Sequence, residues 1–205
     1  MPKIFITGGI SSGKSDFAEK TAISIYSSYF SGTETPPLEK RTDSSLYFIA
    51  TAKFSGKNFC EPDEDMMQKI KKHKEKRSGV FEVRENFENL SGEIDKICGA
   101  PLNMKTVILI DSMTLWLSSA FKDISDYDFT FDAILKICAD LKKIKCSVVT
   151  VADSLGFNMV PADAYLRKFI ELNGLMEQKL SALSDEAYCV IAGNPLPLKQ
   201  IKGEI

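Results

Sequence analysis

The feature that most constrains this chain is a glycine-rich segment, which reads Gly-Gly-Ile-Ser-Ser-Gly-Lys-Ser over residues 8–15. It fits the pattern G-x-x-x-x-G-K-[ST], and it follows an apolar run at 3–7 and precedes a segment of helical period. The glycines allow successive backbone N–H groups to point toward phosphate oxygens, and a helix that begins near Lys14 adds its positive end. Lys14 can reach the outer phosphates. The pattern predicts a phosphate-binding loop that comprises Gly8, Gly9, Ile10, Ser11, Ser12, Gly13, Lys14 and Ser15.

A second element of such a site is an apolar strand that ends in a carboxylate, as in the run from Val107 to Asp111. The aspartate of this element helps to hold Mg²⁺ or its water, and the hydroxyl of Ser15 can ligate the same ion. Apolar strands that end in aspartate are common, so the prediction depends on the pairing with the loop. Ser15 and Asp111 are the predicted metal ligands.

Hydrophobic periodicity predicts the fold class. Apolar runs of strand character alternate with segments of helical period, which favours an α/β fold. We expect three layers, with helices on both faces of a mainly parallel sheet, of the P-loop NTPase (RecA-like) type. The predicted strands are 3–7, 46–50, 106–110, 147–151 and 187–192, and the predicted helices include 16–29, 64–76, 131–143 and 165–183.

Length and composition indicate one globular domain over residues 1–205. The polar segment at 31–45 contains a Pro-Pro pair and predicts a mobile surface loop. A net charge of −2 gives no field that would attract nucleic acid. The chain shows neither a signal peptide nor an apolar run of bilayer length, and its five cysteines form no Cys-x-x-Cys pair. We therefore expect a cytoplasmic protein with free thiols, no membrane span and no nucleic-acid partner.

The only histidine, His73, lies in the basic run Lys-Ile-Lys-Lys-His-Lys-Glu-Lys-Arg at 69–77. One interpretation is the solvated face of an exposed helix, where a lone histidine has no chemical role. The other is a nucleophile that attacks a nucleotide α-phosphate, while Lys72, Lys74, Lys76 and Arg77 neutralise the developing charge. Nearby cations would lower the histidine pKa and keep the imidazole neutral. The residues alone leave both interpretations open.

Taken in order, these motifs resemble the bifunctional adenosylcobinamide kinase / adenosylcobinamide-phosphate guanylyltransferase (CobU-type) family of cobalamin synthesis. The resemblance extends over almost the whole chain and is far more specific than the phosphate loop alone. Besides the loop, it is carried by residues 47–52, Asp65-Met66, the basic run up to Arg77, Glu85, residues 109–117, Gly156, Val160-Pro161, Arg167, Gly174 and residues 192–199.

The resemblance implies a reaction in two stages. ATP or GTP would first phosphorylate the aminopropanol hydroxyl of adenosylcobinamide, a corrinoid small molecule. GMP would then pass from GTP through a covalent guanylyl group on His73 to that phosphate. The family pattern also implies Mg²⁺, a homotrimer, and catalytic roles for His73 and Lys14. The further residues it assigns to the nucleotide site are Thr51, Ala52, Lys53, Lys74, Glu75, Lys76, Arg77, Glu85 and Asp111.

Several positions depart from the common pattern of that family. Asp153-Ser154 stands where Asn-Glu is common, and Asn158 replaces a glycine. Glu177-Gln178 replaces Asn-Gln, and Ser118-Ser119 replaces Thr-Asn. All of these positions lie outside the phosphate loop, so we expect them to affect the acceptor more than nucleotide binding.

Three alternatives remain. One is a P-loop kinase for another small alcohol or nucleoside, in which His73 is incidental. Another is a regulatory GTPase, because Asp153-Ser-Leu-Gly156 fits D-x-x-G, although the chain has no N-K-x-D guanine motif. The third is a nucleotide-binding relative without transferase activity. For Trp116, directly after the Asp111 strand, we expect packing or a subunit contact rather than catalysis.

Overall fold

One sheet of seven strands organises the described part of the chain, which comprises residues 1–30, 45–52, 79–99, 105–156 and 160–199 of this computed structural model. The strand order across the sheet is β3-β2-β4-β5-β1-β6-β7. Every neighbouring pair is parallel except β6 and β7, which form an antiparallel hairpin. The strands are β1 (Lys3–Gly8), β2 (Leu46–Ala50), β3 (Glu82–Arg84), β4 (Val107–Asp111), β5 (Ser147–Asp153), β6 (Glu186–Ile191) and β7 (Asn194–Lys199).

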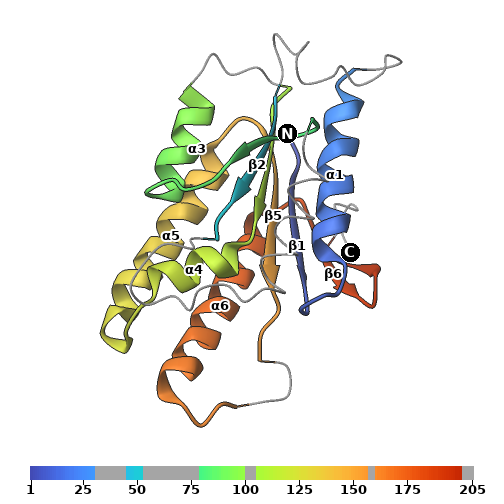
Figure 1. Cartoon of the computed structure of the whole chain (residues 1–205). Coiled ribbons are helices and arrows are strands. Elements are labelled where there is room, and N and C mark those ends of the chain that lie inside the picture. The colour runs from blue at the N-terminus through green and yellow to red at the C-terminus, as the bar shows by residue number, and fades with distance from the viewer. Residues whose placement is uncertain (31–44, 53–78, 100–104, 157–159, 200–205) are drawn as a thin grey trace.

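Helices cover both faces of this sheet, as Figure 1 shows. Helix α1 packs alone among the described helices on one face, and the others gather on the opposite face. The helices are α1 (Lys14–Ser28), α3 (Leu90–Gly99), α4 (Met113–Ala120), α5 (Tyr127–Lys143) and α6 (Ala164–Leu183), with a 3₁₀ turn at Ile124–Asp126. The expected three-layer, mainly parallel α/β fold is confirmed.

The central strands explain this layering. Successive residues of a strand point to opposite faces, and strands buried on both faces read as continuous apolar runs. In β4, Val107 and Leu109 pack toward α1, whereas Ile108 and Ile110 pack toward α4, α5 and α6. All four side chains are fully buried. The sheet therefore has a hydrophobic core on each side.

Most predicted elements are present. The five predicted strands correspond to β1, β2, β4, β5 and β6, and the predicted helices at 16–29, 131–143 and 165–183 correspond to α1, α5 and α6. The prediction missed β3, which has only 3 residues, and β7, whose residues are all exposed and which contains Pro195 and Pro197. Neither has the alternation of apolar and polar residues that identifies a strand. The prediction also missed α3 and α4.

Some expectations concern residues outside the described ones. The predicted helix at 64–76 and almost all of the predicted loop at 31–45 lie there. Of the cysteines, Cys98, Cys138, Cys146 and Cys189 are free thiols, as expected. Among the described residues, no helix has the length and apolar character needed to cross a bilayer. A single domain over the whole of residues 1–205 remains a prediction.

Candidate nucleotide-binding site

The predicted phosphate loop joins the end of β1 at Gly8 to the start of α1 at Lys14. Ser11 and Gly13 adopt left-handed backbone conformations, with φ of 58° and 92°, and the Ser12 N–H donates to the Gly9 carbonyl at 3.2 Å. These features give the backbone of the loop its curled shape. No side chain caps the N-terminus of α1, so the first turn presents its N–H groups and positive dipole end at the loop. This arrangement is suited to a phosphate group.

Lys14 brings a positive charge to the loop. The residue is 8% exposed, and its ammonium group donates to the Gly9 carbonyl at 3.1 Å. The same Nζ atom lies 2.6 Å from Oδ1 of Asp153, at the end of β5. The ammonium is thus held at the mouth of the loop by one neutral and one charged acceptor. The sequence did not predict the second of these contacts.

The loop is supported from behind by β6 and by the turn that follows it. A methyl group on Gly8 would lie 2.5 Å from the Val190 carbonyl oxygen and 2.7 Å from Oγ of Ser12, closer than real Cβ contacts allow. The Gly193 N–H donates to the Ser12 carbonyl at 2.9 Å. Ala192 and Gly193 both have left-handed φ, so this turn is tight and reaches the loop. Sequence reasoning gave the turn no functional role, although residues 192–199 carried part of the family resemblance.

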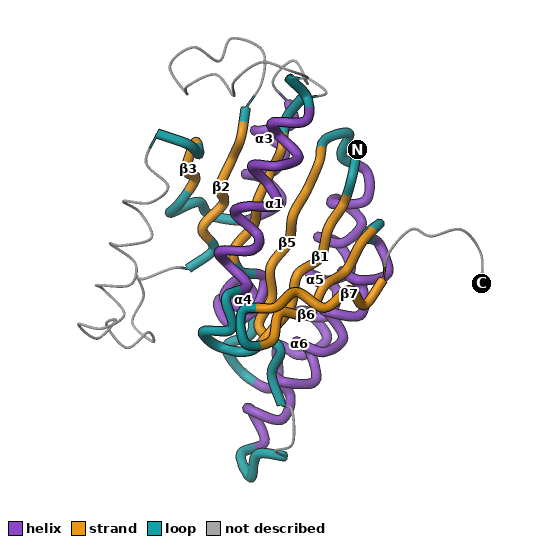
Figure 2. Tube along the Cα trace, turned by 90° about the vertical axis from the view of Figure 1, so that its right-hand side faces the viewer, coloured by secondary structure: helices purple, strands orange, loops and turns teal. Residues whose placement is uncertain are grey.

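Four strands bring the other site residues to the same edge of the sheet. Asp153 is the β5 partner of Gly8 in the parallel register, and Asp111 is the β4 partner of Val151. The Thr51 N–H donates to the Asp111 carbonyl at 3.3 Å, and its hydroxyl donates to the Ser112 carbonyl. Figure 2 shows β5 and β1 side by side in the sheet. Ligands of open parallel sheets bind at this carboxyl edge.

The oxygen donors at this edge fit Mg²⁺. Ser15 lies in the first turn of α1 and Asp111 ends β4, so both predicted ligands lie at the carboxyl edge of the sheet. Among the described residues, no group of three or more His, Cys, Asp or Glu side chains gathers as a complete metal site. A magnesium ion shared by two protein oxygens, substrate phosphates and water needs no such group.

A ring of buried hydrogen bonds fixes the end of β5. The Asp153 N–H donates to Oγ1 of Thr114 at 2.8 Å, and the Thr114 hydroxyl donates to Oδ1 of Asn173 at 2.9 Å. The Asn173 amide closes the ring by donating to the Asp153 carbonyl at 2.9 Å. Thr114 and Asn173 are 6% and 1% exposed. Because buried hydrogen bonds of this kind allow little movement, the ring holds the Asp153 backbone in one position.

Glu177 of α6 places another carboxyl group behind β1. It accepts a hydrogen bond from the Thr7 hydroxyl. Burial raises the pKa of Glu177, the Thr7 hydrogen bond lowers it, and the negative charge of Asp153 raises it further. The net shift is upward, so this carboxyl group holds its proton more tightly than an exposed glutamate does.

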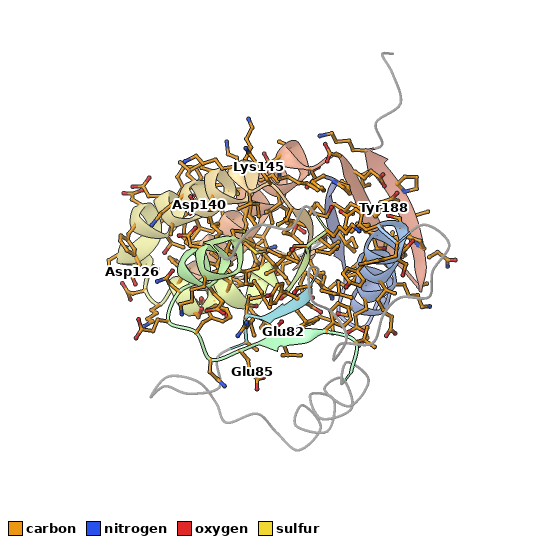
Figure 3. All side chains as sticks on the ribbon, turned by 90° about the horizontal axis from the view of Figure 1, so that it is seen from above. Glu82, Glu85, Asp126, Asp140, Lys145 and Tyr188 are labelled. Atoms are coloured by element: carbon orange, nitrogen blue, oxygen red, sulfur yellow. The ribbon has the colours of Figure 1, made fainter. Side chains whose placement is uncertain are left out.

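The structure does not bring every predicted residue to the loop. Glu85 is exposed just beyond β3, four strand positions from β1 and therefore about 19 Å across the sheet. Figure 3 shows Glu85 at the β3 edge, with Tyr188 on the far side of the sheet near α1. Ala52 follows Thr51 directly. Lys53, His73, Lys74, Glu75, Lys76 and Arg77 lie outside the described residues, so their roles remain predictions.

A cleft of about 740 Å³ opens beside this edge, on the face covered by α3, α4 and α5. Thr51 lines its inner end, and Phe87, Trp116 and Phe129 contribute aromatic surface. Phe129 is 76% exposed, which is unusual for a side chain of its size. Trp116 also packs against the main core, in agreement with the packing role expected for it. The sequence alone gave no sign of the cleft, because α3, α4 and α5 contribute to it from separate parts of the chain.

The fold and the loop together define a P-loop nucleotide-binding α/β protein. A solved structure of a KaiC-like protein from the hyperthermophilic archaeon Pyrococcus horikoshii has the same fold, with a TM-score of 0.50 and 13% identity over 98% of this chain and 80% of that one. Residues 4–198 match the family described as cobinamide kinase / cobinamide phosphate guanyltransferase, and the chain belongs to this family of enzymes.

Relatives of known name support this assignment. The chain is 24% identical over 208 aligned residues to the bifunctional adenosylcobalamin biosynthesis protein CobU of Escherichia coli strain K12, covering 96% of this chain and 99% of the relative. It is also 24% identical over 196 residues to the bifunctional adenosylcobalamin biosynthesis protein CobP of Pseudomonas aeruginosa, covering 95% of each chain. The similarity therefore extends over the full length of these relatives.

Proposed function

We propose that this protein is an adenosylcobinamide kinase and adenosylcobinamide-phosphate guanylyltransferase of cobalamin biosynthesis. The observation that carries the proposal is the phosphate loop with Lys14 at its mouth, in a chain that matches this family from residue 4 to residue 198. The relatives named CobU and CobP are bifunctional proteins of the same biosynthesis. The substrates, the order of the reactions and the histidine intermediate are parts of this proposal.

In the first reaction, the loop and Lys14 hold the outer phosphates of ATP or GTP. The corrinoid hydroxyl attacks the γ-phosphate, the bond to the β-phosphate oxygen breaks, and a nucleoside diphosphate leaves. Ser15 and Asp111 are the residues that would hold Mg²⁺, which neutralises charge on the phosphate oxygens when it is bound. The protein contributes mainly position and positive charge, which are what phosphoryl transfer requires.

In the second reaction, His73 attacks the α-phosphate of GTP and pyrophosphate leaves. The phosphate of the corrinoid then displaces the histidine and takes up GMP, which gives adenosylcobinamide-GDP. Lys74, Lys76 and Arg77 neutralise the departing pyrophosphate, and Thr51, Ala52, Lys53 and Glu75 line the nucleotide. Glu85, which lies away from the phosphate loop, would contact the nucleotide at its far end. Support for this step comes from the sequence and the family, because His73 and its basic neighbours lie outside the described residues.

We assign the corrinoid acceptor to the cleft between α3, α4 and α5. A corrin ring is large and flat, and its rim carries amide groups. Phe87, Trp116 and Phe129 offer aromatic surface to such a ring, while Lys136 and Asp132 on the rim can bind amides. Thr51, at the inner end, lies beside Asp111, so a side arm of the acceptor would point toward the proposed magnesium ligands.

We also propose a homotrimeric, cytoplasmic protein that folds as one domain, as the family resemblance and the composition indicate. In β7, Leu196 and Leu198 are 48% and 60% exposed. They lie two residues apart and therefore on one side of the strand. Exposed leucines that share one side of an edge strand form an apolar patch that suits a subunit contact.

The test of the proposed function is labelling of the protein by GTP that carries a radioactive α-phosphate. Pure wild-type protein and His73→Ala are incubated with this GTP and Mg²⁺, then denatured and counted. We expect acid-labile label on the wild type and none on His73→Ala, because a phosphoramidate bond to histidine is acid-labile. GTP carrying the label on the γ-phosphate is the matched control and should leave the protein unlabelled.

Other results would change the proposal in defined ways. If neither protein is labelled although both bind GTP, the transferase mechanism is wrong, and a small-molecule kinase or a nucleotide-binding protein without transfer activity remains. If both proteins are labelled equally, the nucleophile is another residue.

A further inference from the structure

The lysine of the phosphate loop has a charged partner in the nucleotide-free structure. Lys14 Nζ lies 2.6 Å from Asp153 Oδ1, and the two side chains are 10% and 20% exposed. An ion pair of this geometry in a partly buried site is stronger than one on the surface. The ion pair therefore occupies the ammonium group with which the proposed site would bind the outer phosphates of a nucleotide.

The residue that carries the partner carboxylate is held in place by its backbone. Asp153 is the last residue of β5, its N–H and carbonyl are both bonded in the buried ring with Thr114 and Asn173, and the following Ser154 N–H donates to the Gly8 carbonyl at 3.0 Å. These bonds fix the Cα of Asp153 beside the first glycine of the loop. A phosphate group in the loop would therefore lie within a few ångströms of the Asp153 carboxylate, where repulsion is only weakly screened.

An outer phosphate in the loop and the Asp153 carboxylate would compete for the same ammonium group of Lys14. A nucleotide must consequently replace Asp153 as the partner of Lys14. The free-energy cost of this replacement depends on how many negative charges the ligand brings to Lys14. It is large for a triphosphate, whose outer phosphates need the lysine, and small for a monophosphate, which does not reach it.

We infer that Asp153 sets the nucleotide affinity of this protein by competing with the outer phosphates for Lys14. Asp153 is thus a positioning residue: it holds Lys14 in the empty loop and weakens the binding of triphosphates more than that of monophosphates. This inference rests on the proposed nucleotide site, and it concerns a contact that the family assignment does not predict.

The experiment compares the wild type with Asp153→Asn, which keeps the shape of the side chain and removes its charge. Dissociation constants for Mg²⁺–GTP and for GMP are measured by isothermal titration calorimetry at constant ionic strength. We expect Asp153→Asn to bind GTP about tenfold more tightly, between the effects typical of exposed and of buried ion pairs, and GMP with less than a twofold change. Asp153→Ser serves as a second uncharged variant in case the first folds poorly.

Two controls separate the inference from simpler explanations. Asp128→Asn removes the same charge from an exposed position on α5 and should leave both affinities unchanged. In a Lys14→Met background, Asp153→Asn should no longer tighten GTP binding, because the competition requires the lysine. A gain that persists without Lys14 would overturn the inference.

The remaining outcomes are equally decisive. Equal GTP affinity in the wild type and Asp153→Asn, or weaker binding by the variant, overturns the inference and leaves the proposed function standing. If GMP binding tightens as much as GTP binding, Asp153 repels anions in general and the proposed competition for Lys14 is wrong. If no variant binds GTP or ATP at all, the proposed function fails, and the inference fails with it.

Discussion

At the scale of single residues, the carboxyl edge of the sheet concentrates charge on side chains that the motif alone does not connect. Lys14 and Asp111 belong to the predicted site, whereas Asp153 and Glu177 come from β5 and α6. The fold places the negative charge of Asp153 against Lys14 and close enough to Glu177 to raise the pKa of that buried carboxyl group. The site therefore contains more carboxyl groups than a phosphate-binding loop needs.

Glu177 leads to a prediction at this scale about stability and pH. Its pKa is raised in the folded protein, mainly by burial, above the value of about 4.3 for an unfolded glutamate. The folded protein thus binds the proton more tightly, and this favours folding below the unfolded pKa. The benefit is lost as the pH rises through the folded pKa, so at pH 8 the buried carboxylate destabilises the protein.

Glu177→Gln removes the titrating proton but keeps an oxygen that can accept the Thr7 hydrogen bond. We expect this variant to melt at a higher temperature than the wild type at pH 8, and the difference to shrink toward pH 5. Thermal unfolding followed by circular dichroism at both pH values measures it, with Glu171→Gln on an exposed part of the same helix as control. A difference that is constant over this range would show that Glu177 does not titrate with a raised pKa.

At the scale of elements, helices α3, α4 and α5 build the cleft beside Thr51. The cleft depends on where each helix lies over the sheet, and Phe129 shows this most clearly. It belongs to α5, whose buried residues include Ile134, Ile137 and Leu141, but it faces outward and is 76% exposed. An exposed phenylalanine that lines a cleft contributes little to the core, so we infer that Phe129 has a role in binding.

We therefore predict that Phe129→Ala weakens corrinoid binding and spares the fold. The loss of one aromatic contact should raise the dissociation constant for cobinamide about fivefold, which corresponds to about 1 kcal/mol. The visible absorbance of the corrinoid allows a direct titration. Leu135→Ala is the matched control, since Leu135 is 39% exposed on the same helix and does not line the cleft.

Unchanged affinity in Phe129→Ala would place the acceptor elsewhere. A wild-type protein that binds GTP but no cobinamide would contradict the corrinoid substrate itself. The melting temperature of Phe129→Ala should stay within a few degrees of the wild type, because an exposed side chain is removed.

At the scale of the whole molecule, β7 forms an edge of the sheet and is exposed along its full length. Edge strands risk pairing with other chains, and proline residues on them discourage it. Pro195 and Pro197 fit this pattern, while Leu196 and Leu198, which alternate with them, offer apolar surface. Any contact made by β7 should thus depend on side chains rather than on extension of the sheet.

We predict that the wild type sediments as a trimer, with three times the 22.8 kDa mass of one chain. A double variant with Leu196→Asp and Leu198→Asp should dissociate at least tenfold more readily, because two charges would have to be buried at the contact. Sedimentation equilibrium over a range of concentrations measures this. Leu166→Asp, at a residue that is 42% exposed on α6, is the control. A wild-type monomer would contradict the trimer, and an unaffected double variant would exclude β7 as the contact.

The sequence by itself determined the phosphate loop, the apolar strands and the order in which strands and helices alternate. These features depend on residues close together in the chain: the glycines at 8, 9 and 13 before Lys14, and the run from Val107 to Asp111. Short-range sequence patterns are sufficient to predict them, which is why β1, β4, β5 and α1 lie where they were predicted, to within two residues at each end. The short β3 and the exposed, proline-containing β7 lack such patterns and were missed.

Only the tertiary structure decided what surrounds the loop. Asp153 meets Lys14 because β5 lies next to β1 in the sheet, and Gly193 meets Ser12 because β6 lies on the other side. The Thr114–Asn173 ring and the cleft likewise join helices that are distant in sequence. Strand order follows from how the crossover helices cover both faces of the sheet, and hydrophobic periodicity contains no information about it. The sequence thus identified the phosphate loop, and the packing of the sheet decided which charges compete for its lysine.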